Sequence, residues 1–218
     1  RFAVLFPAYQ EDEVIIDSVK NFLVQEYPRE RYDIIVISNQ MRQDTIDNLK
    51  ALSAKVVKMD SPQSTKIEAL KEAIHYIEKG DIKYDNVVIL DADNIVKPSY
   101  LEKINDALYA GCSALQTHRV AKNRDSNIAV LDSVSEEINN SIFRKGHTRL
   151  GFSSALSGSG MAFEYELFKD IIQECHDINT WKESFCCKMF ISSIWKKYIP
   201  MTRKFEVRGI SITSAVVG

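Results

Sequence analysis

The sequence lacks the glycine-rich motifs that bind phosphate in the commonest nucleotide-binding folds. No GxGxxG follows its first apolar run, and no GxxxxGK[ST] occurs anywhere in the 218 residues. These motifs hold phosphates with backbone N–H groups at the start of a helix. Their absence argues against a glycine-cradled dinucleotide site and against a P-loop, so an anionic ligand would need another kind of site.

The chain also lacks the cysteine patterns of metal-binding scaffolds, a strong net charge and any long apolar run. Its four cysteines show no CxxC or Cys/His metal spacing, so we expect buried free thiols in a reducing compartment. The net charge of −2 gives no global basic field that would attract nucleic acid. No run of about 18 apolar residues, the length that spans a membrane, is present.

The two ends of the chain are apolar. The sequence opens on RFAVLF without a lead-in and closes on GISITSAVVG. We therefore expect it to be the soluble part of a longer, membrane-anchored protein, located in the cytoplasm at the face of a membrane.

Apolar runs alternate with amphipathic patterns along the chain. Apolar runs predict strands at 2–6, 32–38, 54–59, 86–90 and 113–120, and helical spacing predicts helices at 13–25, 44–52, 64–80, 99–110, 127–145, 164–173 and 185–197. Continuous apolar strands joined by amphipathic helices predict an α/β fold with a mostly parallel central sheet flanked by helices on both faces. No repeat or linker divides the chain, so we expect a single domain over 1–218.

Several residues suggest where these elements begin and end. Pro7 is predicted to end the first strand, and Asp44 to cap the second helix. Gly80 is predicted to end the third helix, and Pro98 to lie in the first turn of the fourth. The predicted helix 127–145 has one apolar face, made of Ile128, Leu131, Val134, Ile138 and Ile142.

The loops that follow the first four predicted strands are the candidates for a ligand site. Ligands of open α/β sheets bind beyond the carboxyl ends of the strands. We therefore expect loops 7–11, 38–43, 59–66 and 91–94 to converge on one crevice.

Two aspartates, Asp91 and Asp93, directly follow the apolar run NVVIL, in the stretch Asp91-Ala92-Asp93-Asn94. Two carboxylates with open coordination positions suit Mg²⁺ or Mn²⁺ bridging a diphosphate, and such a cation offsets charge on a leaving phosphate. The alternative is a plain turn with a local cap. The position at the mouth of the expected crevice favours the metal site.

Two segments offer contacts to a nucleotide. In PAYQEDE, Tyr9 has a ring face for stacking, and Glu11 or Asp12 can accept hydrogen bonds from a base or a ribose. The alternative is a helix start, where the helix dipole favours acids. Lys66 begins a helix and could hold phosphate together with the helix N–H groups; the alternative is a solvated lysine.

Three later segments carry further candidate groups. In LSGSGMAF, Gly158 and Gly160 allow positive φ, so their amides and the neighbouring serines could line a sugar or an acceptor; the alternative is a tight turn. Glu183 in TWKESFCC could be a general base or a surface glutamate. FRKGHTRLG is a basic patch or a solvated helix end, with Arg144, Lys145, His147 and Arg149.

Taken in order, FPAYQEDEVI, DADN, GSGMAF and KES resemble the family 2 glycosyltransferases of the GT-A fold, over nearly the whole chain. The resemblance implies a nucleotide-diphospho-sugar transferase fold and a hexosyltransferase-type enzyme of polysaccharide or glycoconjugate biosynthesis. Such an enzyme moves a sugar from a nucleotide sugar, here expected to be UDP-linked, to a hydroxyl acceptor with inversion. The implied partners are the donor and a saccharide, lipid-linked or other hydroxyl acceptor, without nucleic acid.

The resemblance also implies roles for individual residues. Nucleotide-sugar binding is implied for Pro7, Ala8, Tyr9, Glu11, Asn39, Lys66, Asp91, Ala92 and Asp93. Asp91 and Asp93 would also hold Mg²⁺ or Mn²⁺. The acceptor-side G-[ST]-G loop of the family corresponds to Gly158, Ser159 and Gly160, and its catalytic base to Glu183.

Some positions depart from the family pattern. Gln10 stands in place of an asparagine, and Asn39, Gln40 or Asp44 stands where the family has a base-binding aspartate. Ser184 follows Glu183 where the family has an E-D pair, which keeps open a non-catalytic domain that only binds sugar nucleotides. Another alternative is a nucleotidyltransferase on a related sheet, which the acidic, glycine-free first loop disfavours.

Overall fold

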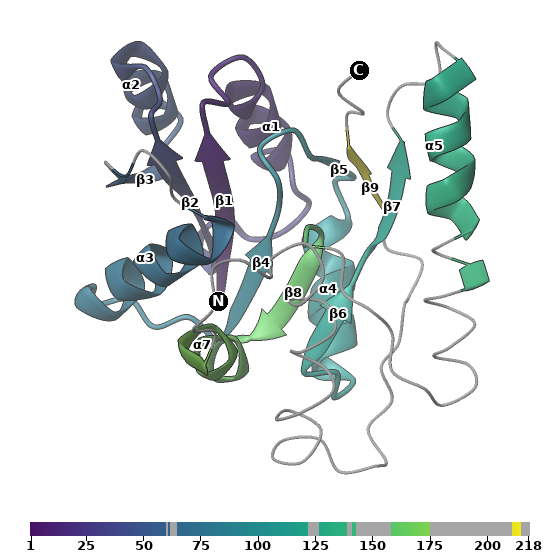
Figure 1. The fold of residues 1–218 in the computed structure, drawn as a ribbon. Helices are drawn as coiled ribbons and strands as arrows, with labels where there is room; N and C mark the ends of the chain where they lie inside the picture. The colour runs from purple at the N-terminus through teal and green to yellow at the C-terminus, as the bar shows by residue number, and fades with distance from the viewer. Residues whose placement is uncertain are drawn as a thin grey trace.

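The computed structural model (Figure 1) describes residues 1–59, 61, 65–121, 127–138, 141–142, 158–174 and 211–214. Its larger sheet has six strands in the order β3 (Lys55–Met59), β2 (Tyr32–Asn39), β1 (Phe2–Tyr9), β4 (Asn86–Ile89), β8 (Met161–Glu164) and β6 (Ala114–Gln116). The neighbours in β3-β2-β1-β4 are parallel, and β8 runs antiparallel to both β4 and β6. The predicted α/β fold with a mostly parallel sheet is therefore confirmed.

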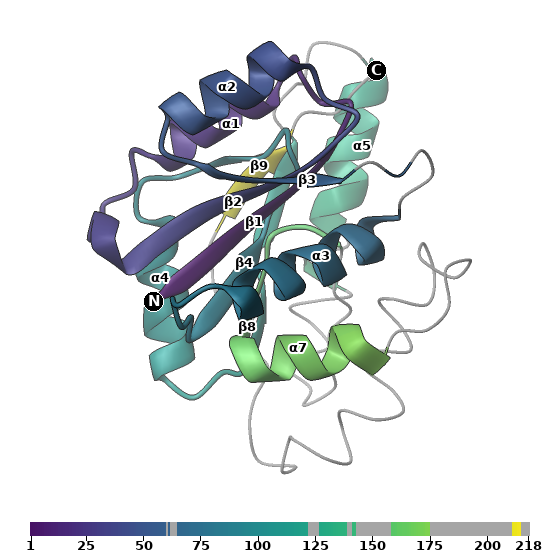
Figure 2. The same cartoon turned by 90° about the vertical axis from the view of Figure 1, so that its left-hand side faces the viewer.

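Helices cover both faces of this sheet, as Figure 2 shows from the side. One face carries α1 (Ile15–Phe22), α2 (Gln43–Ala51) and α4 (Tyr100–Tyr109), and the other carries α3 (Lys66–Lys79) and α7 (Tyr165–Glu174). Alternate residues of each strand enter opposite cores, so Val4 and Phe6 of β1 pack on the first side and Ala3 and Leu5 on the second. Because both faces are covered, the central strands consist mostly of apolar residues.

A smaller sheet lies beside the larger one (Figure 1). It contains β5 (Ile95–Val96), β9 (Ser211–Ser214) and β7 (His118–Ala121), in that order, and α5 (Asn127–Ile138) lies next to β7. The predicted strand 113–120 was wrong in one respect, because it is two strands in different sheets. The break is at Thr117, whose backbone N–H and side-chain hydroxyl both donate to the Gly160 carbonyl, at 2.8 Å each.

Pro7 does not end the first strand, because β1 continues to Tyr9 and pairs with β2 along its whole length. The Leu5 carbonyl accepts from Leu90 N on the β4 side, and pairing with β4 reaches no further than Leu5. Since residues two apart in a strand point their backbone groups the same way, the nitrogen of Pro7 faces this unpaired side. The missing N–H of Pro7 therefore removes no bond of the sheet.

The structure corrects two of the three predictions about helix ends and confirms the third. Asp44 is not the cap of α2: the N-cap residue is Arg42, and Asp44 lies in the first turn, 3.4 Å from the Arg42 guanidinium. Pro98 lies before α4 rather than in its first turn, because Ser99 is the N-cap. Gly80 does end α3, with an extended φ of −89°.

The start of α3 is fixed by a capping box. The Thr65 side chain accepts from Glu68 N, and the Glu68 carboxylate accepts from Thr65 N at 2.8 Å. This reciprocal pair satisfies two N–H groups that have no partner within the helix. It places Lys66 at the first position of α3, next to the site described below.

The apolar face predicted for helix 127–145 is not buried where the structure describes it. Leu131, Val134, Ile138 and Ile142 are all more than 40% exposed, with Leu131 at 68%. Among the described elements, α5 lies beside β7 of the small sheet, at the margin of the molecule (Figure 1). Among the described residues, no helix is long and apolar enough to cross a membrane.

Candidate active site

Segments that are far apart in the sequence meet at Lys66, beyond the carboxyl ends of β1 and β4. The Lys66 ammonium contacts the Asp91 carboxylate and donates to the Gly158 carbonyl at 2.8 Å. The side chains of Lys66 and Asp91 are 18% and 38% exposed, so the pair is accessible from solvent. The predicted convergence of the 59–66 and 91–94 loops is therefore observed at Lys66, with the Gly158 segment as a third member.

The loop that carries Asp91 and Asp93 is held from within by Asn94 and Ser159. The backbone N–H of Asp91 donates to Ser159 Oγ at 2.9 Å and to Asn94 Oδ1 at 3.2 Å. The Ser159 hydroxyl in turn donates to Asn94 Oδ1. Asn94 Nδ2 then donates to Asp93 Oδ1 at 2.9 Å. Both Asn94 and Ser159 are buried, at 1% and 0% exposure.

The segment Gly158–Gly160 is itself fixed by the sheet. Gly160 N donates to the Ile89 carbonyl at 2.9 Å, and the buried Gln116 amide donates to the Ser159 carbonyl at 2.9 Å. Gly158 and Gly160 have φ of +70° and +67°, values that glycine adopts without strain. A Cβ at Gly158 would meet nothing within 4 Å, so the backbone conformation and not a lack of space calls for glycine there.

The loops after β1 and β2 are joined by two glutamines. Gln10 and Gln40 both have positive φ, at 54° and 53°, and Gln10 Nε2 donates to Gln40 Oε1 at 2.7 Å. Both glutamines are exposed. Asn39 directly precedes Gln40 and is buried at 3% exposure; its carbonyl accepts from Gln10 N at 3.1 Å, and its Nδ2 donates to the Ser61 carbonyl at 2.9 Å.

Negative charge accumulates at this end of the sheet. Partial burial of the carboxyl, and then the charges of Asp93 and Asp91, raise the pKa of Glu11 above its ordinary value. A site that makes a neighbouring carboxylate harder to ionise favours a cation.

Two aspartates are a suitable but incomplete ligand set for a divalent metal. Within the described part of the chain, no group of three or more His, Cys, Asp or Glu side chains could hold a metal ion. Mg²⁺ and Mn²⁺ prefer oxygen ligands, and Mg²⁺ usually takes one or two protein carboxylates plus substrate phosphates and water. The Lys66 ammonium already forms an ion pair with the Asp91 carboxylate. Asp91 and Asp93 therefore fit a cation that a bound diphosphate would help to hold.

The remaining predicted site residues are placed as follows. Pro7 and Ala8 are part of β1, with Ala8 buried, and Tyr9 at its end is 46% exposed. Ala92, between the two aspartates in the sequence, is buried at 4% exposure. Glu183 and the basic patch at 144–149 lie outside the described residues. The roles of all these residues in binding or catalysis stay predictions.

Sequence reasoning missed Asn94 as part of the site and missed the glutamine pair. A signal for Asn94 was present, since an amide directly after Asp93 can bond to that carboxylate or to the loop backbone. No local signal pairs Gln10 with Gln40, because their bond depends on β1 and β2 being neighbours.

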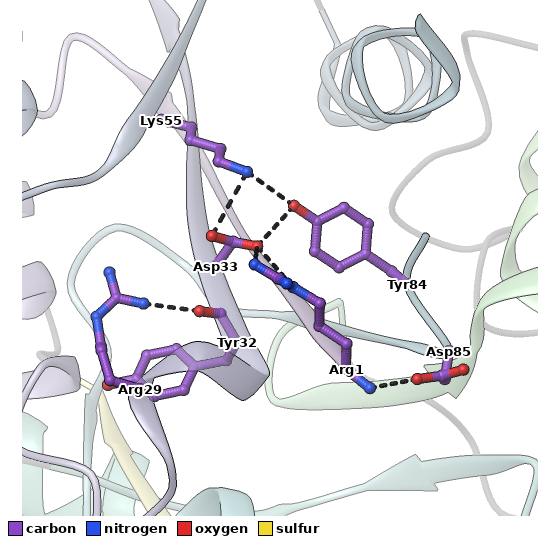
Figure 3. Close-up of polar contacts among 7 residues, drawn as sticks. All are labelled: Arg1, Arg29, Tyr32, Asp33, Lys55, Tyr84 and Asp85. Carbon is purple, nitrogen blue, oxygen red and sulfur yellow. Dashed lines mark hydrogen bonds and ion pairs between the residues drawn. The ribbon is translucent and has the colours of Figure 1, made fainter. Parts of the chain in front are cut away.

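A second polar cluster lies at the opposite, amino end of the sheet (Figure 3). The Asp33 carboxylate accepts from the Arg1 guanidinium at 2.7 and 3.0 Å and from the Tyr84 hydroxyl at 2.9 Å, and Lys55 Nζ lies 3.4 Å from it. Burial alone would raise the pKa of Asp33, but the bonds from Arg1 and Tyr84 and the charge of Lys55 outweigh it and lower the pKa.

Comparison with known proteins gives one family and a group of similar folds. A sequence model described as "Glycosyltransferase like family 2" matches residues 1–188. Among curated protein sequences, none matches significantly. Of the solved structures, S. aureus TarS 1-349 in complex with UDP-GlcNAc has a TM-score of 0.67 at 13% identity, covering 100% of this chain and 59% of that one.

Two further structures are similar. The mannosyltransferase PcManGT from Pyrobaculum calidifontis, in complex with GDP-Man and Mn²⁺, has a TM-score of 0.66 at 17% identity, covering 100% of this chain and 57% of that one. Glucosyl-3-phosphoglycerate synthase from Mycobacterium tuberculosis, with Mn²⁺ and UDP, has a TM-score of 0.50 at 19% identity, covering 76% and 57%. The chain thus spans less than two thirds of each of these proteins, and at these identities the likeness concerns the fold.

Proposed function

The chain belongs to glycosyltransferase family 2, and on this premise we propose that it transfers a sugar from a nucleotide sugar to a hydroxyl group of an acceptor, with inversion at the anomeric carbon. The predicted GT-A type of fold is confirmed by the solved structures that it resembles.

One observation carries the proposal: Lys66, Asp91 and Gly158 meet beyond the carboxyl ends of the parallel strands. This is where open α/β sheets bind ligands. The meeting combines a cation suited to phosphate with carboxylates suited to a metal, and Glu11 adds further negative charge nearby. A nucleoside diphosphate bound through Mg²⁺ or Mn²⁺ is the ligand class that needs both kinds of group.

Asp91 and Asp93 would hold the cation, which supplies charge to offset the developing negative charge of the leaving diphosphate. Lys66 contributes a second positive charge. Its ammonium can leave the Asp91 carboxylate and donate to a phosphate oxygen instead, because its three N–H donors sit on a flexible side chain. Tyr9, at 46% exposure, offers a ring face to the base.

The donor is proposed to be a UDP-sugar. TarS is described with UDP-GlcNAc and the M. tuberculosis synthase with UDP and Mn²⁺, whereas PcManGT is described with GDP-Man and Mn²⁺. These complexes support a nucleotide sugar and a divalent metal as ligands. Because they include both uridine and guanosine nucleotides, the two bases are to be compared by experiment.

The base that removes the acceptor proton is proposed to be Glu183, which lies outside the described residues. In this scheme the acceptor oxygen forms a bond to the anomeric carbon, and its proton passes to the Glu183 carboxylate. The bond between the anomeric carbon and the diphosphate oxygen breaks, and its electron pair stays on that oxygen. Gly158, the one partly exposed member of Gly158–Gly160, is proposed to face the acceptor. The location at the cytoplasmic face of a membrane stays a prediction.

The test is a calorimetric titration of the chain with UDP, UDP-sugars and GDP-sugars, each with and without Mn²⁺. We expect one class of nucleotide to bind with Mn²⁺ and to bind weakly without it. We also expect the protein to release that nucleoside diphosphate from the corresponding sugar donor. In the Asp93→Asn variant the Mn²⁺-dependent part should disappear. The matched control is Asp81→Asn, which removes one negative charge from an exposed residue before β4. Nucleotide-sugar binding that is equal with and without Mn²⁺, or that survives Asp93→Asn, would contradict the proposal.

A further inference from the structure

The hydroxyl of Ser159 and the amide of Asn94 are buried groups that no ligand reaches in this conformation, yet they bond to the loop of the two aspartates. Ser159 is 0% exposed and Asn94 is 1% exposed. Buried polar groups of this kind are retained with full sets of partners, because an unpaired one costs roughly 1–3 kcal/mol. Their partners therefore indicate what they are for.

We propose that Ser159 and Asn94 are positioning residues of the donor site, which orient Asp91 and Asp93 toward a bound cation; this rests on the function proposed above. The resemblance to the family instead assigns Ser159 to the acceptor side. The structure favours the donor side for the Ser159 side chain, because its oxygen accepts from Asp91 N at 2.9 Å and its proton is given to Asn94 Oδ1.

The bonds also fix which way the Asn94 amide is turned. Its oxygen accepts from the Ser159 hydroxyl and from Asp91 N, so its NH₂ group must face the other way, toward Asp93. There it donates to Asp93 Oδ1 at 2.9 Å. One carboxylate oxygen of Asp93 is thus held by the protein, which restricts the rotation of the carboxylate and leaves its direction set before a ligand arrives.

Ser159 can act in this way because its backbone is pinned. The Gln116 amide and Gly160 N tie the segment to β6 and β4, and the positive φ of Gly158 and Gly160 turns Ser159 inward. A hydroxyl on so constrained a segment cannot rotate outward to an acceptor without breaking several bonds. Groups that orient metal ligands in this manner typically affect metal affinity by 10–100-fold when they are removed.

The experiment measures Mn²⁺ and UDP binding by calorimetry, and Mn²⁺ binding alone by electron paramagnetic resonance, with no acceptor present. We expect Ser159→Ala to weaken Mn²⁺-dependent UDP binding by about 10-fold, and Ser159→Thr, which keeps the hydroxyl, to restore most of it. Ser113→Ala is the matched control, because Ser113 directly precedes β6 and its carbonyl accepts from Glu164 N, at the end of β8 remote from Ser159.

A second variant guards against a simple folding defect. Asn94→Ala removes the donor that faces Asp93 and the acceptor that faces Ser159 without adding a charge, so we expect a loss of Mn²⁺ affinity at least as large as that of Ser159→Ala. Thermal unfolding of each variant without ligand shows whether the fold persists.

The outcomes separate this inference from the proposed function. Wild-type protein that binds UDP with Mn²⁺, together with Ser159→Ala and Asn94→Ala variants that bind equally well, would overturn the positioning role alone. A wild-type protein that binds no nucleotide with Mn²⁺ would overturn both. If Ser159→Ala fails to fold, retained affinity in Asn94→Ala overturns the inference and reduced affinity in that folded variant supports it.

Discussion

The two ends of the central sheet both carry partly buried carboxylates, but the surroundings of these carboxylates differ in charge. At the amino end, Asp33 is surrounded by the Arg1 guanidinium, the Lys55 ammonium and the Tyr84 hydroxyl (Figure 3), and its pKa is lowered. At the carboxyl end, Asp91, Asp93 and Glu11 gather near the ammonium of Lys66, and the pKa of Glu11 is raised.

From this difference we expect the amino end to serve the fold and the carboxyl end to serve a ligand. A carboxylate that is already matched by cations and hydrogen bonds contributes to stability and attracts nothing further. An excess of carboxylates disfavours its own ionised state and is relieved by an added cation. Binding and folding should therefore respond to different substitutions at the two ends.

The largest expected effect is on binding at the carboxyl end. Asp91→Asn should weaken Mn²⁺-dependent nucleotide binding by at least about 100-fold, or roughly 2.7 kcal/mol, because the cation loses one of two carboxylates. The same variant should unfold at nearly the same temperature as the wild type when no ligand is present. Calorimetry and thermal unfolding check the two halves. A large loss of stability without ligand would mean that this end also serves the fold.

The next effect is on stability at the amino end. Asp33→Asn should lower the free energy of unfolding by about 2 kcal/mol, since hydrogen bonds to charged groups contribute about 1.5–3 kcal/mol, and should leave nucleotide binding unchanged. Because the folded pKa of Asp33 is below its ordinary 3.8, its contribution is present above that pH and is lost as the pH falls through the folded pKa. Urea denaturation at neutral pH and near pH 3 measures this. A stability difference between the two proteins that grows toward low pH would refute the assignment.

Replacing Lys66 should affect metal and nucleotide in opposite directions. Lys66→Met removes the ammonium that lies on Asp91, so Mn²⁺ alone should bind slightly more tightly, whereas UDP with Mn²⁺ should bind about 10-fold more weakly, or roughly 1.4 kcal/mol. Separate titrations with Mn²⁺ and with Mn²⁺ plus UDP show this split. Lys79→Met, at the other end of α3, is the control. Parallel losses for both ligands would indicate that Lys66 only supports the loop.

The smallest effect concerns Glu11. Its raised pKa means that the ionised carboxylate is disfavoured in the fold, so stability decreases as the pH rises from the ordinary value of 4.5 through the folded pKa. Glu11→Gln should therefore raise the stability of the ligand-free protein at neutral pH, by less than about 0.5 kcal/mol because the side chain is exposed. The gain should vanish near pH 4 and should shrink when Mn²⁺ is added. Denaturation curves at the two pH values, with Asp81→Asn for comparison, test it.

Much of the fold followed from local patterns, and the errors fall where local patterns compete with tertiary pairing. Apolar runs found β1 to β4, and helical spacing together with Gly80 found α3 within two residues at either end. The run 113–120 gave no sign of its division at Thr117, because the division depends on the Gly160 carbonyl. The insertion of β8 between β4 and β6 was likewise not visible in the sequence.

The candidate site divides in the same way. Asp91 and Asp93 were identified from their position after a buried strand, and Lys66 from its position at the start of a helix. That Lys66 lies on Asp91 depends on the packing of α3 against the sheet. The inward direction of Ser159 depends on bonds to two other strands, so the motif alone pointed to the acceptor side.

By itself the sequence determined the layered α/β class, the family, and the kind of groups at the site, because hydrophobic period, helix caps and residue type act over a few neighbouring residues. Only the tertiary structure decided which of those groups meet. Asp91 N and Ser159 Oγ are 68 positions apart in the chain, and Lys66 and Gly158 are 92 apart. Contacts at such separations form only when the whole sheet has assembled, so residue type could suggest the donor site while its supporting network remained invisible until the strands were in place.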